Sequence, residues 1–78
     1  MIIDLQRFVA AEQPHWTQLE RLLDRLEAEP TARLSLEQLT QFHQLYERAS
    51  ADLARITTFA AEPATRRYLE NLVARAYS

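Results

Sequence analysis

The two histidines are the side chains whose type and spacing come closest to a metal site. Glu12 and His15 match the Glu-x-x-His spacing of di-iron helical bundles, in which two such motifs and two further glutamates converge between four helices. Here Pro14 interrupts the motif, and the sequence holds no second copy. His43 and Glu47 lie four residues apart and could face the same side of a helix, but two or three scattered ligands do not complete a coordination shell. We therefore predict no metal and no cofactor.

Nucleophilic side chains are also poorly supported by their neighbours. His43 invites comparison with histidine phosphotransfer domains, helical bundles of similar size that carry a lysine and a glycine one turn after the phosphoacceptor. This chain has Tyr46 and Glu47 there, and a carboxylate repels an incoming phosphoryl group. Ser35 suits a helix cap, Ser50 lies in mid-helix, and neither histidine has a context typical of a catalytic triad. We predict no catalytic residue and no enzymatic activity.

The amino-acid composition excludes several other classes of site. Glycine and cysteine are absent from the 78 residues, which leaves little room for a phosphate-cradling loop and none for a disulfide framework or a thiolate zinc site. The nine basic residues are all arginine, and eleven carboxylates outnumber them to give a net charge of −2. Nucleic-acid-binding domains usually carry a basic stripe, so we expect no nucleic-acid partner.

The sequence predicts one folded domain over residues 1–78 that lies outside the membrane. Its 47% of hydrophobic residues is ordinary for a globular protein. Residues 1–4 lack the basic and apolar regions of a signal peptide, and no stretch approaches the roughly 18 to 20 apolar residues of a membrane span. A soluble, cytosolic segment is the expectation.

The clearest pattern is a heptad repeat that predicts a long helix at about 36–60. Spacings between its apolar residues alternate between three and four for almost three repeats. Ser35 and Gln38 predict a capping box at its start, in which each side chain accepts a hydrogen bond from the backbone amide of the other residue. The seam consists of Leu39, Phe42, Tyr46, Ala49, Leu53, Ile56 and Ala60.

Two shorter helices are predicted upstream, at about 4–12 and 14–28. Pro14 suits the first turn of a helix, where its missing amide hydrogen has no partner, and a residue before proline avoids the helical conformation. We therefore favour a break near Gln13 over one kinked helix, with Pro30 ending the second helix. Its apolar stripe, which we assign to the core, consists of Trp16, Leu19, Leu22, Leu23 and Leu26.

A last helix is predicted at about 63–77, with Pro63 in its first turn. Tyr68 and Tyr77 flank its apolar face and mark either a membrane-interface contact or a protein contact. No cap follows Tyr77, which favours a chain that continues beyond Ser78. The apolar face consists of Leu69, Leu72, Val73 and Ala76.

These elements predict an all-α fold. Because the connections at about 28–35 and 61–63 are short, consecutive long helices should pack antiparallel. The expected architecture is an antiparallel three-helix bundle with a short additional N-terminal helix.

Several charged residues have the spacing of ion pairs on exposed helix faces. Arg48 and Asp52 are one such pair, and because they lie beside the seam they could instead form a partly buried pair that fixes helix register. The other pairs are Asp52 with Arg55 and Arg66 with Glu70.

Three stretches of the chain follow one another in a distinctive order and spacing. They are QPHWTQLERLL at 13–23, LYERASADLA at 45–54 and YLENLVARAY at 68–77. Together they resemble the N-terminal region of the stage II sporulation protein M family of bacterial integral membrane proteins, over most of the chain. The resemblance implies that transmembrane helices follow this segment, and that its role lies in working with peptidoglycan-degrading partners rather than in catalysis. Arg66, Arg67 and Arg75 would then favour the cytosolic side of the membrane.

The leading hypothesis is therefore a non-enzymatic helical domain on the cytosolic face of the bacterial inner membrane, which helps a membrane protein to assemble. Its expected partners are proteins, including a second copy of itself, and no small-molecule substrate is expected. The alternatives are a free-standing soluble adaptor or dimerisation module and, more remotely, a metal-binding helical bundle.

Overall fold

The computed structural model of the chain describes residues 4–29, 31, 33–59 and 62–77. Pro30, Ala60 and Ser78, which entered the expectations above, lie outside these described residues. The three helices are α1 (Leu5–Ala28), α2 (Leu36–Phe59) and α3 (Pro63–Tyr77).

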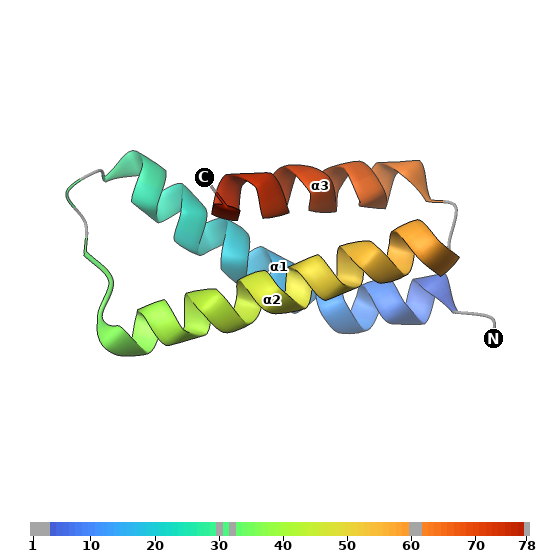
Figure 1. The fold of residues 1–78 in the computed structure, drawn as a ribbon, viewed down its shortest axis with the longest axis horizontal. Helices are drawn as coiled ribbons and strands as arrows, with labels where there is room; N and C mark the ends of the chain where they lie inside the picture. The colour runs from blue at the N-terminus through green and yellow to red at the C-terminus, as the bar shows by residue number, and fades with distance from the viewer. Residues whose placement is uncertain (1–3, 30, 32, 60–61, 78) are drawn as a thin grey trace.

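The helices form an elongated bundle with extents of 44 × 21 × 17 Å. All three pairs of helices are in contact, and Figure 1 shows α1 crossing behind α2 while α3 lies along both. The predicted all-α three-helix bundle is confirmed. None of the described helices is both long enough and apolar enough to cross a membrane.

Helix α1 runs through Pro14 without a break, so the predicted separate helix at about 4–12 is wrong. A proline inside a helix removes the hydrogen bond to the carbonyl four residues earlier, here that of Ala10. Both residues are exposed, and water can therefore satisfy that carbonyl. Glu12 and Trp16 are buried on either side of the proline, so packing of the inner face of α1 outweighs the local preference for a break.

Side-chain caps fix where α1 and α2 begin. Asp4 Oδ1 accepts a hydrogen bond from the backbone amide of Arg7 at 3.2 Å. Ser35 Oγ accepts from the amide of Gln38 at 3.1 Å, and Gln38 Oε1 accepts from the amide of Ser35 at 2.9 Å. The reciprocal bonds of the predicted capping box are thus present, and a cap of this kind contributes about 1 kcal/mol.

One hydrophobic core lies between the three helices. Leu19 and Leu69 are completely inaccessible to solvent. The Trp16 ring packs against Phe8 and Tyr68, with ring centroids 6.3 and 6.2 Å apart, so the tryptophan belongs to the core. The buried apolar residues are Trp16, Leu19, Leu23, Leu45, Ala49, Ile56, Leu69 and Leu72.

The heptad seam of α2 is not buried along its whole length. Leu39, its first residue, is 52% exposed, so its assignment to the core is wrong. Leu45, which lies outside the seam, is buried instead. Leu26 on α1 and the seam residues Phe42, Tyr46 and Leu53 are half-buried.

The exposure of Leu39 follows from the unequal lengths of the helices. Helix α3 has 15 residues, whereas α1 and α2 have 24 each. Figure 1 shows that α3 stops short of the end where α1 and α2 diverge towards their connection. Within the described residues, the first turns of α2 therefore have no third helix over them.

Candidate functional site

A polar cluster joins α1 to α2. It consists of the buried residues Glu12, Trp16 and Asp52 and the exposed Arg48. Trp16 Nε1 donates a hydrogen bond to Asp52 Oδ2 at 2.8 Å. Arg48 donates from Nε to Glu12 Oε1 and from Nη2 to Glu12 Oε2, both at 2.9 Å. Arg48 and Asp52 are therefore bound to α1 through separate partners, whereas the sequence pattern had paired them with each other.

Burial and the neighbouring carboxylate change the titration of this cluster. Desolvation and the charge of Glu12 raise the pKa of Asp52 to about 6, although the hydrogen bond from Trp16 opposes the rise. The hydrogen bonds from Arg48 lower the pKa of Glu12 despite its burial. A protonated Asp52 can donate to Glu12, so the two carboxyl groups can hold one proton between them.

The position of the cluster argues against catalysis by its carboxyl groups. Asp52 is only 2% exposed and Glu12 only 7%, and a general acid or base must come within hydrogen-bond reach of its substrate. The arrangement can instead make the contact between α1 and α2 depend on pH, because the protonation of Asp52 changes with pH.

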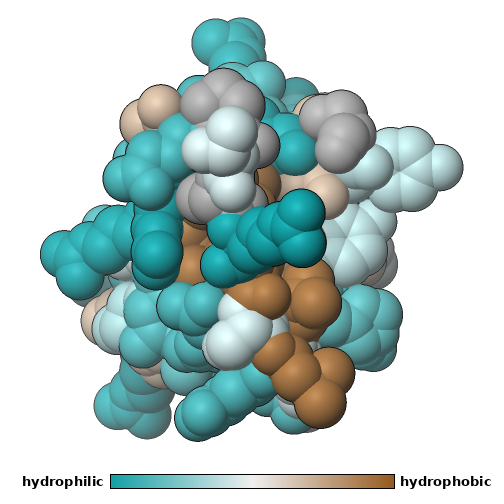
Figure 2. Space-filling model, turned by 90° about the vertical axis from the view of Figure 1, so that its left-hand side faces the viewer, coloured by the Kyte–Doolittle hydropathy of each residue, from teal (hydrophilic) through white to brown (hydrophobic). Residues whose placement is uncertain are grey.

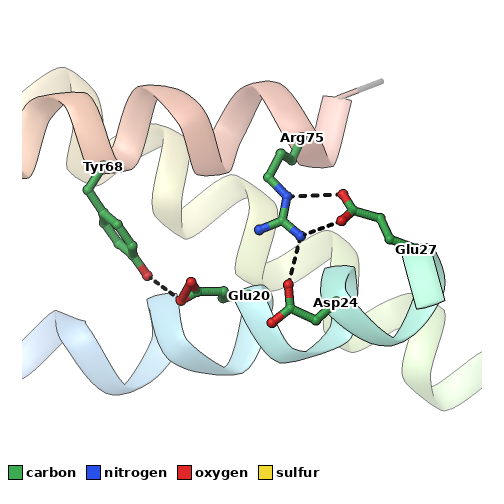
Figure 3. Close-up of polar contacts among 5 residues, drawn as sticks. All are labelled: Glu20, Asp24, Glu27, Tyr68 and Arg75. Atoms are coloured by element: carbon green, nitrogen blue, oxygen red, sulfur yellow. Dashed lines mark hydrogen bonds and ion pairs between the residues drawn. The ribbon is translucent and has the colours of Figure 1, made fainter.

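Polar contacts also tie α3 to one edge of α1, as Figure 3 shows. Tyr68 donates a hydrogen bond from its hydroxyl to Glu20 Oε2 at 3.1 Å. Arg75 donates from Nε to Glu27 Oε1 at 3.0 Å and from Nη2 to Asp24 Oδ1 at 2.8 Å. Tyr68, one of the two tyrosines considered for an external contact, is therefore engaged within the chain.

Replacement of Tyr68 by phenylalanine is expected to lower the free energy of unfolding by about 1 kcal/mol. The ring still packs against Trp16, so only the half-buried hydrogen bond to Glu20 is lost, and one such bond is typically worth about 0.5 to 1.5 kcal/mol. Tyr77→Phe is the matched control, because Tyr77 is 82% exposed. Urea unfolding of the two variants should separate them; equal stabilities would show that the Glu20 contact contributes nothing.

The large hydrophobic side chains that are most exposed among the described residues lie at the start of α2 and at the end of α3. Leu36 is 81% exposed, Leu39 52% and Tyr77 82%. We call the surface formed by Leu36 and Leu39, in the first turns of α2, the open end. Figure 2 views the molecule from the side where α1 and α2 connect, and shows hydrophobic side chains reaching the surface among hydrophilic ones.

Leu36 was missed as a site residue because it lies outside the heptad. It is the first residue of α2, directly after the capping serine. The sequence did hold a signal for it. Leu36 lies in the first turn of the helix and is out of phase with the seam, so it has no position in the core.

The residues first considered for metal chemistry do not converge in the described part of the chain. Glu12 is bound by Arg48, whereas His43 Nε2 and Glu47 Oε1 form an exposed pair at 2.6 Å on α2. Among the described residues there is no group of three or more histidine, cysteine, aspartate or glutamate side chains that could hold a metal ion. The hydroxyl of Ser50 is buried without a hydrogen-bond partner in that same part of the chain.

Comparison with known protein families finds a match over most of the chain. A family model described as a domain of unknown function, DUF8413, matches residues 6–78 and so covers most of α1 and all of α2 and α3. No curated protein and no solved structure matches the chain.

Proposed function

Because the chain belongs to the DUF8413 family, whose function is unknown, we propose a function from its geometry. The chain is a non-enzymatic helical interaction domain that binds a protein partner through the open end. The observation that carries this proposal is the 81% exposure of Leu36 beside the half-exposed Leu39 on one uncovered stretch of α2.

Exposed leucines are common singly, but a hydrophobic patch with a polar rim is typical of a binding surface. The core of the bundle is formed by other residues, all of them at most 6% exposed. Leu36 and Leu39 thus add little to the packing of the isolated chain. A partner that covers them would gain about 25 cal/mol for each Å² of apolar surface removed from water.

The resemblance to the stage II sporulation protein M family extends this proposal to a location. In that version the domain lies on the cytosolic face of a bacterial inner membrane and helps a membrane protein to assemble. The competing proposal is a free-standing adaptor that uses the same surface. Fractionation of the full-length native protein separates them, because a membrane pellet that resists high salt supports the first and a soluble fraction supports the second.

Site-specific photocrosslinking tests the interaction itself. A photoreactive phenylalanine analogue at position 36 of the full-length protein, in its native host, should give an adduct with another protein. The same analogue at Ala51, which is exposed further along the same helix, should not. Absence of an adduct from position 36, or equal yields from both positions, would contradict the proposed function.

A further inference from the structure

A polar groove lies between α1 and α2, and α3 contributes no residue to its lining. We propose that this groove binds a carboxylate side chain of the protein partner, whose contact segment is therefore acidic at this point. The inference rests on the proposed function and names the chemistry of the partner. The groove has a volume of about 390 Å³ and is lined by His15, Gln18, Gln41, Gln44, Leu45 and Arg48.

The guanidinium of Arg48 is held in position by α1. Its Nε and Nη2 atoms donate to the two oxygens of Glu12 at 2.9 Å, and Glu12 itself is only 7% exposed. A guanidinium has five N–H donors, and no described residue accepts a hydrogen bond from Nη1. Because the Arg48 side chain is 51% exposed, its remaining donors can reach a second carboxylate.

The other polar side chains that line the groove are three glutamines and a histidine, and they make no side-chain hydrogen bond within the described part of the chain. Each glutamine amide has two N–H donors for a carboxylate oxygen. The hydrogen bonds from Arg48 are the main cause of the lowered pKa of Glu12, and the charge of His15 lowers it further. No carboxylate is among the described residues of the lining, so an acidic side chain would meet donors from both helices.

The charge of the groove favours a carboxylate over a phosphate group. Arg48 is the one arginine among the lining residues described, and Glu12 already balances part of its charge. A phosphate group carries about 1.5 to 2 negative charges at pH 7, whereas a carboxylate carries one. One guanidinium edge with neutral amides beside it suits the smaller charge.

The groove continues into the open end. A second hollow begins at Leu36 and shares two glutamines with the groove; its lining is Leu36, Glu37, Thr40, Gln41 and Gln44. Leu36 and Arg48 are 12 residues apart on α2, or about 18 Å, which about five or six residues of extended chain span. One segment of the partner can therefore place an apolar side chain on Leu36 and an acidic one at Arg48. Glu37 would repel an acidic side chain at the Leu36 end.

A capped glutamate tests the chemistry of the groove directly. N-acetyl-glutamate amide, added to the isotope-labelled protein up to about 100 mM, should shift the NMR signals of Arg48 Nε–H and of the Gln41 and Gln44 side-chain amides; this is the range expected for one charge-assisted contact. The uncharged N-acetyl-glutamine amide should bind about tenfold more weakly. Equal effects of the two compounds, or no shift from either, would overturn the assignment. Tighter binding of inorganic phosphate at the same ionic strength would also overturn it, because it would identify a site for a free anion.

Substitution of a glutamine in the groove makes the test specific. Gln44→Glu places a carboxylate four residues before Arg48, where it can occupy the remaining donors, so the shifts caused by the capped glutamate should disappear. Gln6→Glu makes the same change at an exposed position of α1 outside the groove and should leave them in place. Persistence of the shifts in Gln44→Glu would contradict the proposal.

The same pair of variants connects the groove to the partner. The photocrosslinked adduct from position 36 of the full-length protein should fall about tenfold in Gln44→Glu and stay unchanged in Gln6→Glu. An adduct that Gln44→Glu leaves unchanged would overturn the acidic contact and leave the proposed function standing. Absence of the adduct from the unmodified background would instead contradict the proposed function itself.

Discussion

At pH 8 the Asp52→Asn variant is expected to be more stable than the wild-type chain by about 2 to 3 kcal/mol. The wild-type protein must then hold an ionised carboxylate that is 2% exposed. Desolvation and Glu12 raise the pKa of Asp52 from 3.8 to about 6, and each pKa unit corresponds to about 1.4 kcal/mol. Asparagine removes the charge and keeps an oxygen that can accept the Trp16 hydrogen bond.

The direction of the pH dependence follows from the same shift. A pKa that is higher in the folded state means that the stability contributed by the protonated form is complete below pH 3.8 and is lost as the pH rises through about 6. The lowered pKa of Glu12 acts in the opposite direction, but only below its ordinary value of 4.5. The wild-type chain should therefore be less stable at pH 8 than at pH 5, and the difference should shrink in Asp52→Asn.

Urea unfolding at the two pH values measures this effect. Trp16 is the only tryptophan and donates directly to Asp52, so its fluorescence reports on the cluster itself. Glu70→Gln, which removes a carboxylate from the exposed face of α3, should leave the difference between pH 5 and pH 8 in place. If wild-type and Asp52→Asn unfold with the same free energy at pH 8, the charge on Asp52 carries no cost.

Two identical substitutions within the predicted core should have very different effects. Leu69→Ala is expected to lower the free energy of unfolding by about 2 to 5 kcal/mol, because Leu69 is fully buried and the alanine leaves a cavity. Leu39→Ala should stay within about 0.5 kcal/mol of wild-type, as is usual for exposed positions. Chemical denaturation of both variants makes the comparison, and a similar loss from each would show that Leu39 belongs to the core.

Leu69→Ala could abolish folding, since a domain of this size is stable by only about 4 to 12 kcal/mol. Ile56→Val then serves as a milder probe of the same core, because Ile56 is 1% exposed. Its expected cost is about 0.5 to 1.5 kcal/mol. No measurable cost at Ile56 would contradict the packing described for α2 and α3.

The fold could be predicted from the sequence because its signals are local. The heptad from Leu39 to Ile56 indicated the long second helix, and the Ser35–Gln38 box marked its start to within one residue. Pro14 misled the prediction for the same reason. Its local preference for a break was plain, whereas the packing of Glu12 and Trp16 that overrides it depends on a helix distant in sequence.

The contacts that define the sites could not be predicted in this way. Arg48 and Glu12 are 36 residues apart, as are Asp52 and Trp16, and nothing in either helix alone identifies the partner. The exposure of Leu39 depends on where α3 ends relative to α2. A seven-residue repeat shows which side of a helix is apolar, but it does not show how far the neighbouring helix extends to cover it.

The central claim is that Leu36 and Leu39 serve a contact between proteins. It is tested most directly by the yield of photocrosslinked adduct from position 36 of the full-length protein, measured with and without Leu39→Glu. The account predicts one protein adduct in the unmodified background and its loss on Leu39→Glu. An adduct that survives Leu39→Glu unchanged, or no adduct in either background, would contradict it.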